Sequence, residues 1–305
     1  MNELLTDIKS LEIETLKNLK NSKASNTLRA YKSDYSDFVL FCSKNNFSAM
    51  PADPKILSLY LTHLSQTSKF STLKRRIASI SVIHKLKGHY IDTKHPLIIE
   101  NLLGIKRLKG SNQKAKKPIL INDLKNIIKV INKLKIKNNI KIRDKALILI
   151  GFSGGFRRSE LVSIEHEDVE FVREGVKIFV KRSKTDQSGE GMTKAIPSFN
   201  TIEYCPVSHL ENWIFTQEAK KGKIFQLSDR SVALIIKKYV NLAGLDPTNY
   251  AGHSLRSGFA TSTAEAGAEE RNIMAMTGHK TTQMVRRYIN EANLFKNNAL
   301  NKIKI

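Results

Sequence analysis

Histidine, arginine and tyrosine side chains near the carboxyl end of the chain have the spacing that an anion-binding site requires. His253 and Arg256 lie three residues apart in a segment that Ser254 can cap, so both side chains project from the first turn of one helix. The start of a helix also attracts anions. Further along, His279 follows a threonine–glycine pair in a predicted loop, and Tyr288 lies nine residues later in a predicted helix. We therefore expect an imidazole and a phenol to face the same anion as the arginine.

A second arginine, Arg157, follows a glycine pair that comes directly after the apolar run Ala146–Phe152. The apolar run predicts a buried helix, and the glycines predict a turn that leads into the next helix. Glu160 lies three residues after Arg157, in that next helix. The sequence thus presents a guanidinium at the end of a buried element.

A lysine-containing hairpin is predicted between these two regions. Apolar residues in Val176–Val180, followed by the glycine-containing break Ser188–Gly191, indicate two strands with Lys184 near the tip that joins them. Lys181 and Arg182 lie close by in the same hairpin. The sequence therefore leaves them open as alternatives to Lys184.

In the order and spacing of these residues the chain resembles the tyrosine recombinase (phage integrase) family. One such motif arises by chance in many chains, whereas the whole set in order over about half of the chain is specific. The motifs are G-F-R-R-S-E-L, S-K-T-D-Q, H-S-L-R and T-G-H, and the matching active-site residues are Arg157, Lys184, His253, Arg256, His279 and Tyr288.

The resemblance implies that Tyr288 attacks a DNA phosphate and forms a covalent phosphotyrosine, which conserves the bond energy without a nucleotide cofactor. Arg157 and Arg256 would hold the phosphate oxygens through paired hydrogen bonds that a lysine does not reproduce. A free tyrosine, with a pKa of about 10, needs such positive charge or a nearby proton acceptor to become a nucleophile.

The other residues of the set are expected to transfer protons and to hold the active site in place. The resemblance implies that Lys184 protonates the leaving 5′ oxygen, that His253 accepts or shuttles a proton, and that His279 donates a hydrogen bond to a phosphate oxygen. Glu160 resembles the acidic position that braces the family's active site. These cationic and donor groups take the place of paired divalent ions, so neither a metal nor another cofactor is expected.

The charge of the chain favours a polyanionic partner. Its 305 residues include 51 Lys and Arg against 28 Asp and Glu, a formal net charge of +23. Such an excess points to nucleic acid, although a lysine-rich proteome accounts for part of it without any partner. The separated cysteines Cys42 and Cys205, together with a start that lacks a secretory pattern, favour a reduced, cytoplasmic protein. The longest apolar run is too short to span a membrane, so no membrane partner is expected.

The first part of the chain is predicted to be all-α. Residues 1–110 contain four amphipathic helical periods and resemble the core-binding (SAM-like) domain of the family, which implies a clamp over duplex DNA. Residues 111–117 have the polar, basic composition of a linker. Basic residues of both segments are expected to contact DNA, and these are Lys74, Arg75, Arg76, Lys106, Arg107, Lys109, Lys114, Lys116 and Lys117.

Residues 118–305 are predicted to form an α-rich catalytic domain with a small antiparallel sheet, so that the fold as a whole is mainly α. Asp144–Phe152 is apolar nearly all round and suits a central helix, and the expected strands are Val169–Phe171, Val176–Arg182 and Thr193–Ile196.

The tail that follows Tyr288, residues 289–305, carries the apolar residues Leu294, Phe295, Leu300 and Ile303. The resemblance implies that this tail docks on a neighbouring protomer and gives a homotetramer on two DNA sites. Packing of the tail on its own domain is the alternative.

The expected function is a site-specific DNA recombinase or integrase that acts through a 3′-phosphotyrosine and a Holliday junction. A type IB topoisomerase, which relaxes supercoils without paired sites, and a catalytically degenerate DNA-binding architectural protein remain as alternatives. The sequence does not choose between chromosome-dimer resolution and integration of a mobile element, and an accessory directionality factor is a possible further partner.

Overall fold

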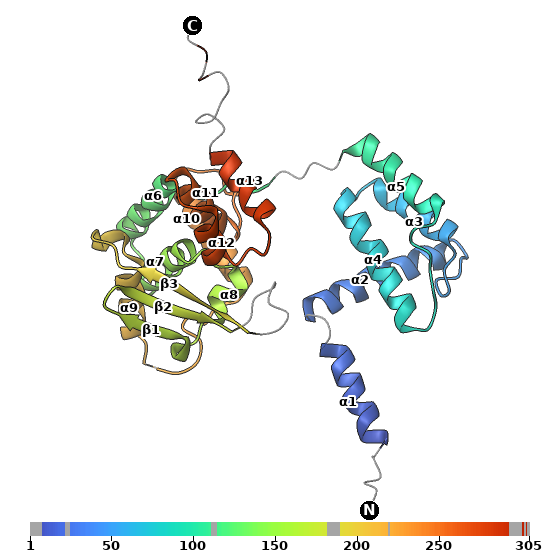
Figure 1. Cartoon of the computed structure of the whole chain (residues 1–305), viewed down its shortest axis with the longest axis horizontal. Coiled ribbons are helices and arrows are strands. Elements are labelled where there is room, and N and C mark those ends of the chain that lie inside the picture. The colour runs from blue at the N-terminus through green and yellow to red at the C-terminus, as the bar shows by residue number, and fades with distance from the viewer. Residues whose placement is uncertain are drawn as a thin grey trace, which may run out of the picture. The chain divides into compact units, whose positions relative to one another are not determined.

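The computed structural model describes residues 8–21, 25–110, 115–181, 190–218, 220–292, 301 and 303. The chain divides into two compact units, residues 1–114 and residues 115–305 (Figure 1). Helices account for most of the described residues, and their one sheet has three antiparallel strands. The predicted fold class, mainly α with a small antiparallel sheet, is confirmed.

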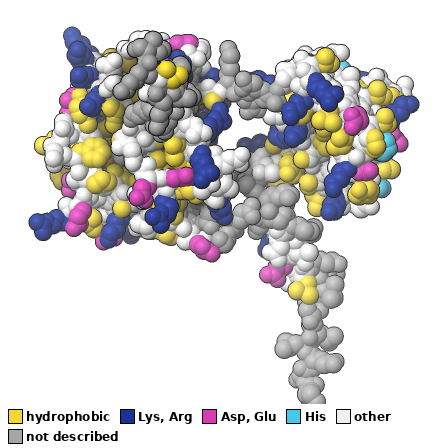
Figure 2. Space-filling model, turned by 45° about the horizontal axis from the view of Figure 1, so that its top comes forward, with side chains coloured by type: hydrophobic (Ala, Val, Ile, Leu, Met, Phe, Trp, Pro, Cys, Tyr) yellow, Lys and Arg dark blue, Asp and Glu magenta, His cyan; other side chains and the backbone are white. Residues whose placement is uncertain are grey.

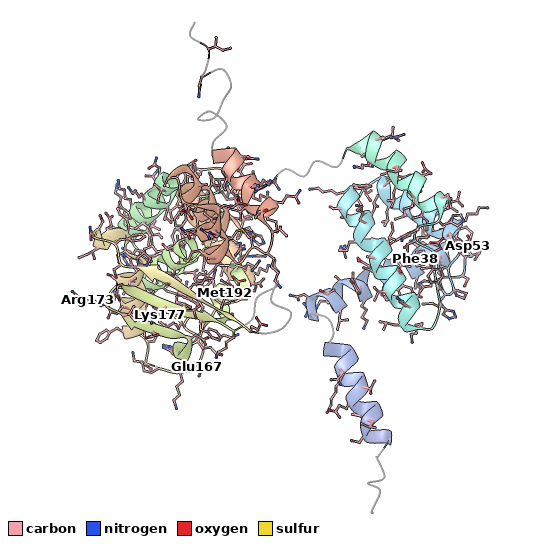
Figure 3. The ribbon with its side chains drawn as sticks, viewed as in Figure 1. Phe38, Asp53, Glu167, Arg173, Lys177 and Met192 are labelled. Carbon is pink, nitrogen blue, oxygen red and sulfur yellow. The ribbon has the colours of Figure 1, made fainter. Side chains whose placement is uncertain are left out.

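The first unit is helical throughout its described part. Its elements are α1 (Ile8–Asn21), α2 (Ser25–Lys44), α3 (Pro54–Ser65), α4 (Phe70–Leu86) and α5 (Pro96–Lys109). Proline at the first position starts both α3 and α5, and the Asp53 carboxylate accepts a hydrogen bond from the Lys55 N–H at 2.6 Å. Figure 3 shows Asp53 at the start of α3 and Phe38, which is fully buried, among the helices. The apolar faces of α2 to α5 thus enclose one core.

A buried carboxylate ties α2 to α4. Asp34 is 1% exposed and forms ion pairs with Arg75 and with Arg76, whose side chain is only 15% exposed. Arg76 also pairs with Asp37 at 2.9 Å. These contacts give Arg75 and Arg76 a structural role that the sequence did not reveal. Their expected contact with DNA stays a prediction.

Replacing Asp34 with alanine should destabilise the first unit by about 3 kcal/mol, because the mostly buried Arg76 guanidinium would lose the carboxylate at 3.2 Å. The measurement is the free energy of unfolding in urea. Glu100→Ala on the exposed face of α5 is the control and should change it by less than about 0.5 kcal/mol. Equal unfolding curves for the two variants would contradict this role of Asp34.

The second unit is built around one buried helix, α7. Its helices are α6 (Ile121–Lys133), α7 (Asn138–Ser153), α8 (Arg158–Ser163), α9 (Pro206–Phe215), α10 (Asp229–Leu242), α11 (Ser254–Glu265), α12 (Glu270–Thr277) and α13 (Thr282–Ala292), with short 3-10 turns at His166–Asp168, Ile202–Tyr204 and Pro247–Asn249. The predicted burial of Asp144–Phe152 in α7 is confirmed, and even Asp144 is only 2% exposed. Its carboxylate accepts hydrogen bonds from Tyr239 at 2.6 Å and from Arg143. A polar group in the core is therefore satisfied.

The sheet has the order β1 (Val169–Val172), β2 (Gly175–Val180) and β3 (Met192–Pro197), with each neighbouring pair antiparallel. Buried and exposed residues alternate along β2 and β3, as a half-buried sheet requires. Val180 pairs with Met192 at the end of the β2–β3 ladder. Residues 182–189, which include Lys184 and Arg182, lie outside the described residues.

Some helix ends differ from the sequence prediction. The sequence also predicts a helix over Pro206–Lys220, but α9 ends at Phe215, and the Thr216 hydroxyl donates to the Trp213 carbonyl oxygen at 2.8 Å. Ser254, expected as a cap, is the first residue of α11, and its hydroxyl instead accepts a hydrogen bond from the Ala251 N–H at 2.9 Å.

Candidate active site

The turn after α7 positions Arg157. Gly155 has φ +53°, a conformation that favours glycine, and turns the chain so that Arg157 stands immediately before α8. Glu160 then bonds Arg157 twice, since its carboxylate accepts the backbone N–H at 2.9 Å and a guanidinium N–H at 2.6 Å. Burial acts to raise the pKa of Glu160, but the hydrogen bonds and charge of Arg157, with the charge of Lys194, lower it below its ordinary value. Glu160 therefore stays ionised and fixes Arg157.

The start of α11 positions the second arginine. Arg256 is 4% exposed and donates from Nη1 to the Gly155 carbonyl oxygen at 2.8 Å, which joins α11 to the turn before Arg157. Its buried Nη2 has no hydrogen-bond partner among the described residues. Burial and the charge of Arg157 lower the pKa of Arg256 to about 10, so the guanidinium remains charged at neutral pH. A buried, charged donor is thereby left to a ligand such as a phosphate oxygen.

Gly278, in the left-handed backbone conformation, ends α12 and sets the position of His279. Gly278 has φ +62° and caps α12, so His279 leaves the helix axis while remaining only 8% exposed. The Tyr288 ring lies with its centroid 6.0 Å from that of the imidazole. Tyr288 also packs against the small apolar cluster formed by α11, α12 and α13. Neighbouring helices thus hold the phenol beside the imidazole.

A cavity of about 460 Å³ brings together the predicted catalytic residues that the structure describes. Three guanidinium groups, two imidazoles and a phenol line this one space. The lining residues are Arg157, Arg158, Ser159, Asp229, His253, Arg256, His279, Met284 and Tyr288. Arg158, which follows Arg157 in the chain, was not among the predicted catalytic residues but also lines this cavity. The geometry suits phosphoryl transfer, because cationic groups and a hydroxyl meet in one space.

Lys181, one of the alternatives to Lys184, forms ion pairs with acidic residues. Its ammonium forms ion pairs with Glu165 at 2.6 Å, with Asp168 at 3.2 Å and with Glu167. Hydrogen bonds to these carboxylates raise the pKa of Lys181 above its ordinary value. Such a lysine gives up its proton less readily than an unpaired one. Of the hairpin alternatives this disfavours Lys181, and it leaves Lys184 and Arg182, which both lie outside the described residues.

The predicted linker ends against the second unit. The Lys117 N–H bonds the Asn249 carbonyl oxygen at 2.7 Å, and the Lys116 ammonium bonds that of Thr248. Lys106, Arg107 and Lys109 are exposed in the last turns of α5, and Lys74 lies over the Phe70 ring. Lys114 lies outside the described residues. Contact of these residues with DNA stays a prediction.

One charged residue beside the site was missed by the sequence reasoning. Lys194 in β3 is fully buried, and its ammonium donates to the Gly154 carbonyl oxygen at 2.7 Å and to that of Met276 at 2.5 Å. Burial lowers the pKa of Lys194 to about 7. The available signal was strand alternation, since Lys194 shares the inward face of β3 with Ile196.

The stability of the second unit should depend on pH through Lys194. Its pKa is about 7 in the folded chain and 10.5 by its ordinary value, so between these two pH values the unfolded chain binds the extra proton. The free energy of unfolding therefore rises with pH across this window, by up to about 1.4 kcal/mol per pH unit. Below the window Lys194 is charged in both states, so the folded chain carries the full cost of the buried charge. Lys194→Met should remove this slope. Urea unfolding of both chains from pH 7 to 10 measures it, and parallel stability curves would contradict the assignment.

The imidazole of His279 has a defined tautomer. The Thr277 hydroxyl donates its single proton to the Ile273 carbonyl oxygen at 2.6 Å, so toward His279 Nδ1, at 2.7 Å, it acts as acceptor. His279 Nδ1 therefore carries a proton. Burial and the charges of Arg256 and Arg157 lower the pKa of His279 to about 4, so the ring is neutral at pH 7 and Nε2 holds a lone pair. The expected donation from His279 to a phosphate oxygen then requires a second proton on the ring.

Nitrogen-15 NMR of the ring tests this tautomer. We expect His279 to be neutral and protonated at Nδ1 at pH 7, and to gain a second proton only as the pH falls toward about 4. A signal from the tautomer protonated at Nε2 would contradict the hydrogen-bond assignment.

Two further features concern ligands and membranes. Among the described residues, no group of three His, Cys, Asp or Glu side chains is arranged to hold a metal ion. Across that same part of the chain, helices that combine the length and apolar character of a membrane span do not occur.

Known proteins are similar to this chain in sequence and in fold. The model of the phage integrase family matches residues 119–294. An integrase/recombinase XerD homolog from Selenomonas ruminantium is 42% identical, over 96% of this chain and 89% of that protein. The Tn1549 transposon integrase in complex with transposon right end DNA superposes with a TM-score of 0.63 at 13% identity, over 93% of this chain and 97% of its own. The XerH recombinase bound to palindromic difH substrate superposes with a TM-score of 0.62 at 18% identity, over 81% of this chain and 73% of its own. The chain therefore belongs to the phage integrase family and is a tyrosine site-specific recombinase.

Proposed function

We propose that the chain cuts and rejoins DNA at a specific duplex site through a 3′-phosphotyrosine on Tyr288 and passes through a Holliday junction. The observation that carries the proposal is the cavity that Arg157, Arg256, His253 and His279 line together with Tyr288. Charged donors in such a space stabilise the charge that develops on phosphoryl oxygens.

In the proposed cleavage step, the Tyr288 hydroxyl oxygen bonds to phosphorus while the bond from phosphorus to the 5′ oxygen breaks. His253 takes the phenolic proton, and Lys184 gives a proton to the departing 5′ oxygen. Arg157 and Arg256 hold the non-bridging oxygens. Rejoining is the reverse attack by a 5′ hydroxyl on the phosphotyrosine. Because the bond energy is retained throughout, no cofactor takes part.

DNA binding is proposed for the first unit as a core-binding domain, with the linker lying along phosphates. Support comes from the net charge of +23 and from basic side chains on both units (Figure 2). The structural relatives described above are complexes with transposon-end or difH DNA, which supports a double-stranded recombination site as the partner. We propose that the protein acts on DNA in the cytoplasm. An accessory directionality factor is proposed as a further partner.

The proposed assembly is a homotetramer on two DNA sites, with residues 289–305 exchanged between protomers. Residues 293–300 of this tail lie outside the described residues, so the proposal depends on their apolar side chains and on the family. Deletion from Leu294 onward should abolish synapsis and strand exchange while one protomer still binds one site. Unaltered synapsis would rule the exchange out.

A nicked suicide substrate tests the function. DNA bound by the protein is first selected from the sequence that flanks the gene, and a nick near the cleavage point then lets the 5′ fragment diffuse away. The expected result is a covalent protein–DNA complex, followed by recombination only when two sites are supplied. Relaxation of supercoils with a single site would favour the topoisomerase alternative, and binding without any complex would favour the architectural one.

A further inference from the structure

We infer that Lys194 is a positioning residue for DNA cleavage, because its ammonium fastens the turn that carries Arg157 to the turn that carries His279. This inference rests on the proposed function and adds a residue that belongs to neither turn. Lys194 lies in β3 on the inward face of the sheet, paired with Ile178 of β2.

The two hydrogen bonds of the ammonium span the site. One acceptor is the carbonyl oxygen of Gly154, the residue that caps α7 three positions before Arg157, at 2.7 Å. The other is the carbonyl oxygen of Met276, in the last turn of α12 three positions before His279, at 2.5 Å. These turns are far apart in the sequence. A single side chain thus fixes the separation of a phosphate-binding arginine and an imidazole.

The surroundings explain how a lysine persists in a buried position. The carboxyl ends of α7 and α12 both point toward Nζ, and the partial negative charge of a helix end favours a cation. The Phe156 ring lies beneath the ammonium, with its centroid 4.5 Å away. Of the charged groups that act on it, Glu160 favours the charged form, whereas Arg256 and Arg157 oppose it. These fixed partners therefore take the place of the water molecules that would solvate the ammonium on the surface.

An apolar residue would fill this position at lower cost. The other inward residues of β2 and β3 are Val176, Ile178, Val180 and Ile196, and a buried charge among them is expensive unless it is well paired. A methionine of similar length would keep the packing but lose both hydrogen bonds. The presence of lysine at this position is explained by the clamp, and β3 is also the strand that follows the segment containing Lys184.

Lys194→Met tests the inference, with Lys177→Met as the matched control. Lys177 lies on the exposed face of β2 and pairs only with Glu170 among the described residues (Figure 3). We measure the dissociation constant for a duplex site and, at saturating DNA, the single-turnover rate of covalent complex formation per folded molecule. Lys194→Met should bind DNA as the natural chain does but form the complex on the order of 10²-fold more slowly, the effect of a displacement of about 1 Å in the site. Lys177→Met should leave both quantities unchanged.

The outcomes separate the inference from the function. A Lys194→Met chain that forms the complex within about threefold of the natural rate overturns the inference and leaves the function intact. Failure of the natural chain to form any complex overturns the function instead.

Should Lys194→Met not fold, NMR of the natural chain decides the matter. As Lys194 titrates, the signals of the Arg157 guanidinium and the His279 ring should shift with the same midpoint as its ε-methylene. Signals that stay constant through that midpoint overturn the clamp.

Discussion

Tyr288→Phe will bind its DNA site as tightly as the natural chain and form no covalent complex. The substitution removes only the hydroxyl oxygen that would bond to phosphorus, while the ring keeps its contacts with α11 and α12. The ring also keeps its place 6.0 Å from the imidazole of His279. The loss in cleavage rate should therefore be complete within detection, which is the largest effect that we expect from any single substitution.

Two measurements check this expectation. Denaturing electrophoresis of the suicide substrate shows whether protein remains attached to DNA, and a gel-shift titration gives the dissociation constant. Tyr250→Phe is the control, since Tyr250 is a buried tyrosine of the same unit that does not line the cavity. A persistent complex with Tyr288→Phe would refute the nucleophile assignment.

Arg256→Lys should slow cleavage by a factor on the order of 10² to 10³, as loss of a preorganised donor usually does. The guanidinium uses Nη1 to hold the Gly155 carbonyl oxygen and keeps a buried Nη2 for the phosphate. A lysine ammonium is a single point of charge and does not reach both places at once.

The control for Arg256→Lys is Arg230→Lys, at an exposed position in α10. Single-turnover cleavage at saturating DNA separates the chemical step from binding. We expect an unchanged rate for Arg230→Lys and a strongly reduced rate for Arg256→Lys. Retention of the natural rate within about threefold in Arg256→Lys would show that the second arginine is not required.

Much of the site was predictable because its residues occur in short motifs at helix ends. The glycines before Arg157 and His279 mark turns, and the structure uses Gly155 and Gly278 in the left-handed conformation at these points. The nearly continuous apolar run Asp144–Phe152 likewise predicted the buried α7. Local patterns thus determined which side chains would lie at element ends.

Contacts between distant segments were not predictable from one sequence. A lysine in β3 gives no local indication that it bonds carbonyl oxygens near residues 154 and 276. Arg76 was expected only to contact DNA, but its side chain in α4 pairs with Asp34 in α2. Both cases depend on tertiary packing, which overrides the usual exposure of charged residues. The tautomer of His279 belongs with them, because it depends on which carbonyl oxygen receives the Thr277 proton.

The most direct test of the central claim is mass spectrometry of the covalent complex. Trypsin cleaves after Arg287, so Tyr288 begins its own peptide. We predict that, after nuclease digestion, this peptide carries a nucleotide joined to the phenolic oxygen through its 3′ phosphate. A nucleotide on a different residue, or one joined through a 5′ phosphate, would contradict the account.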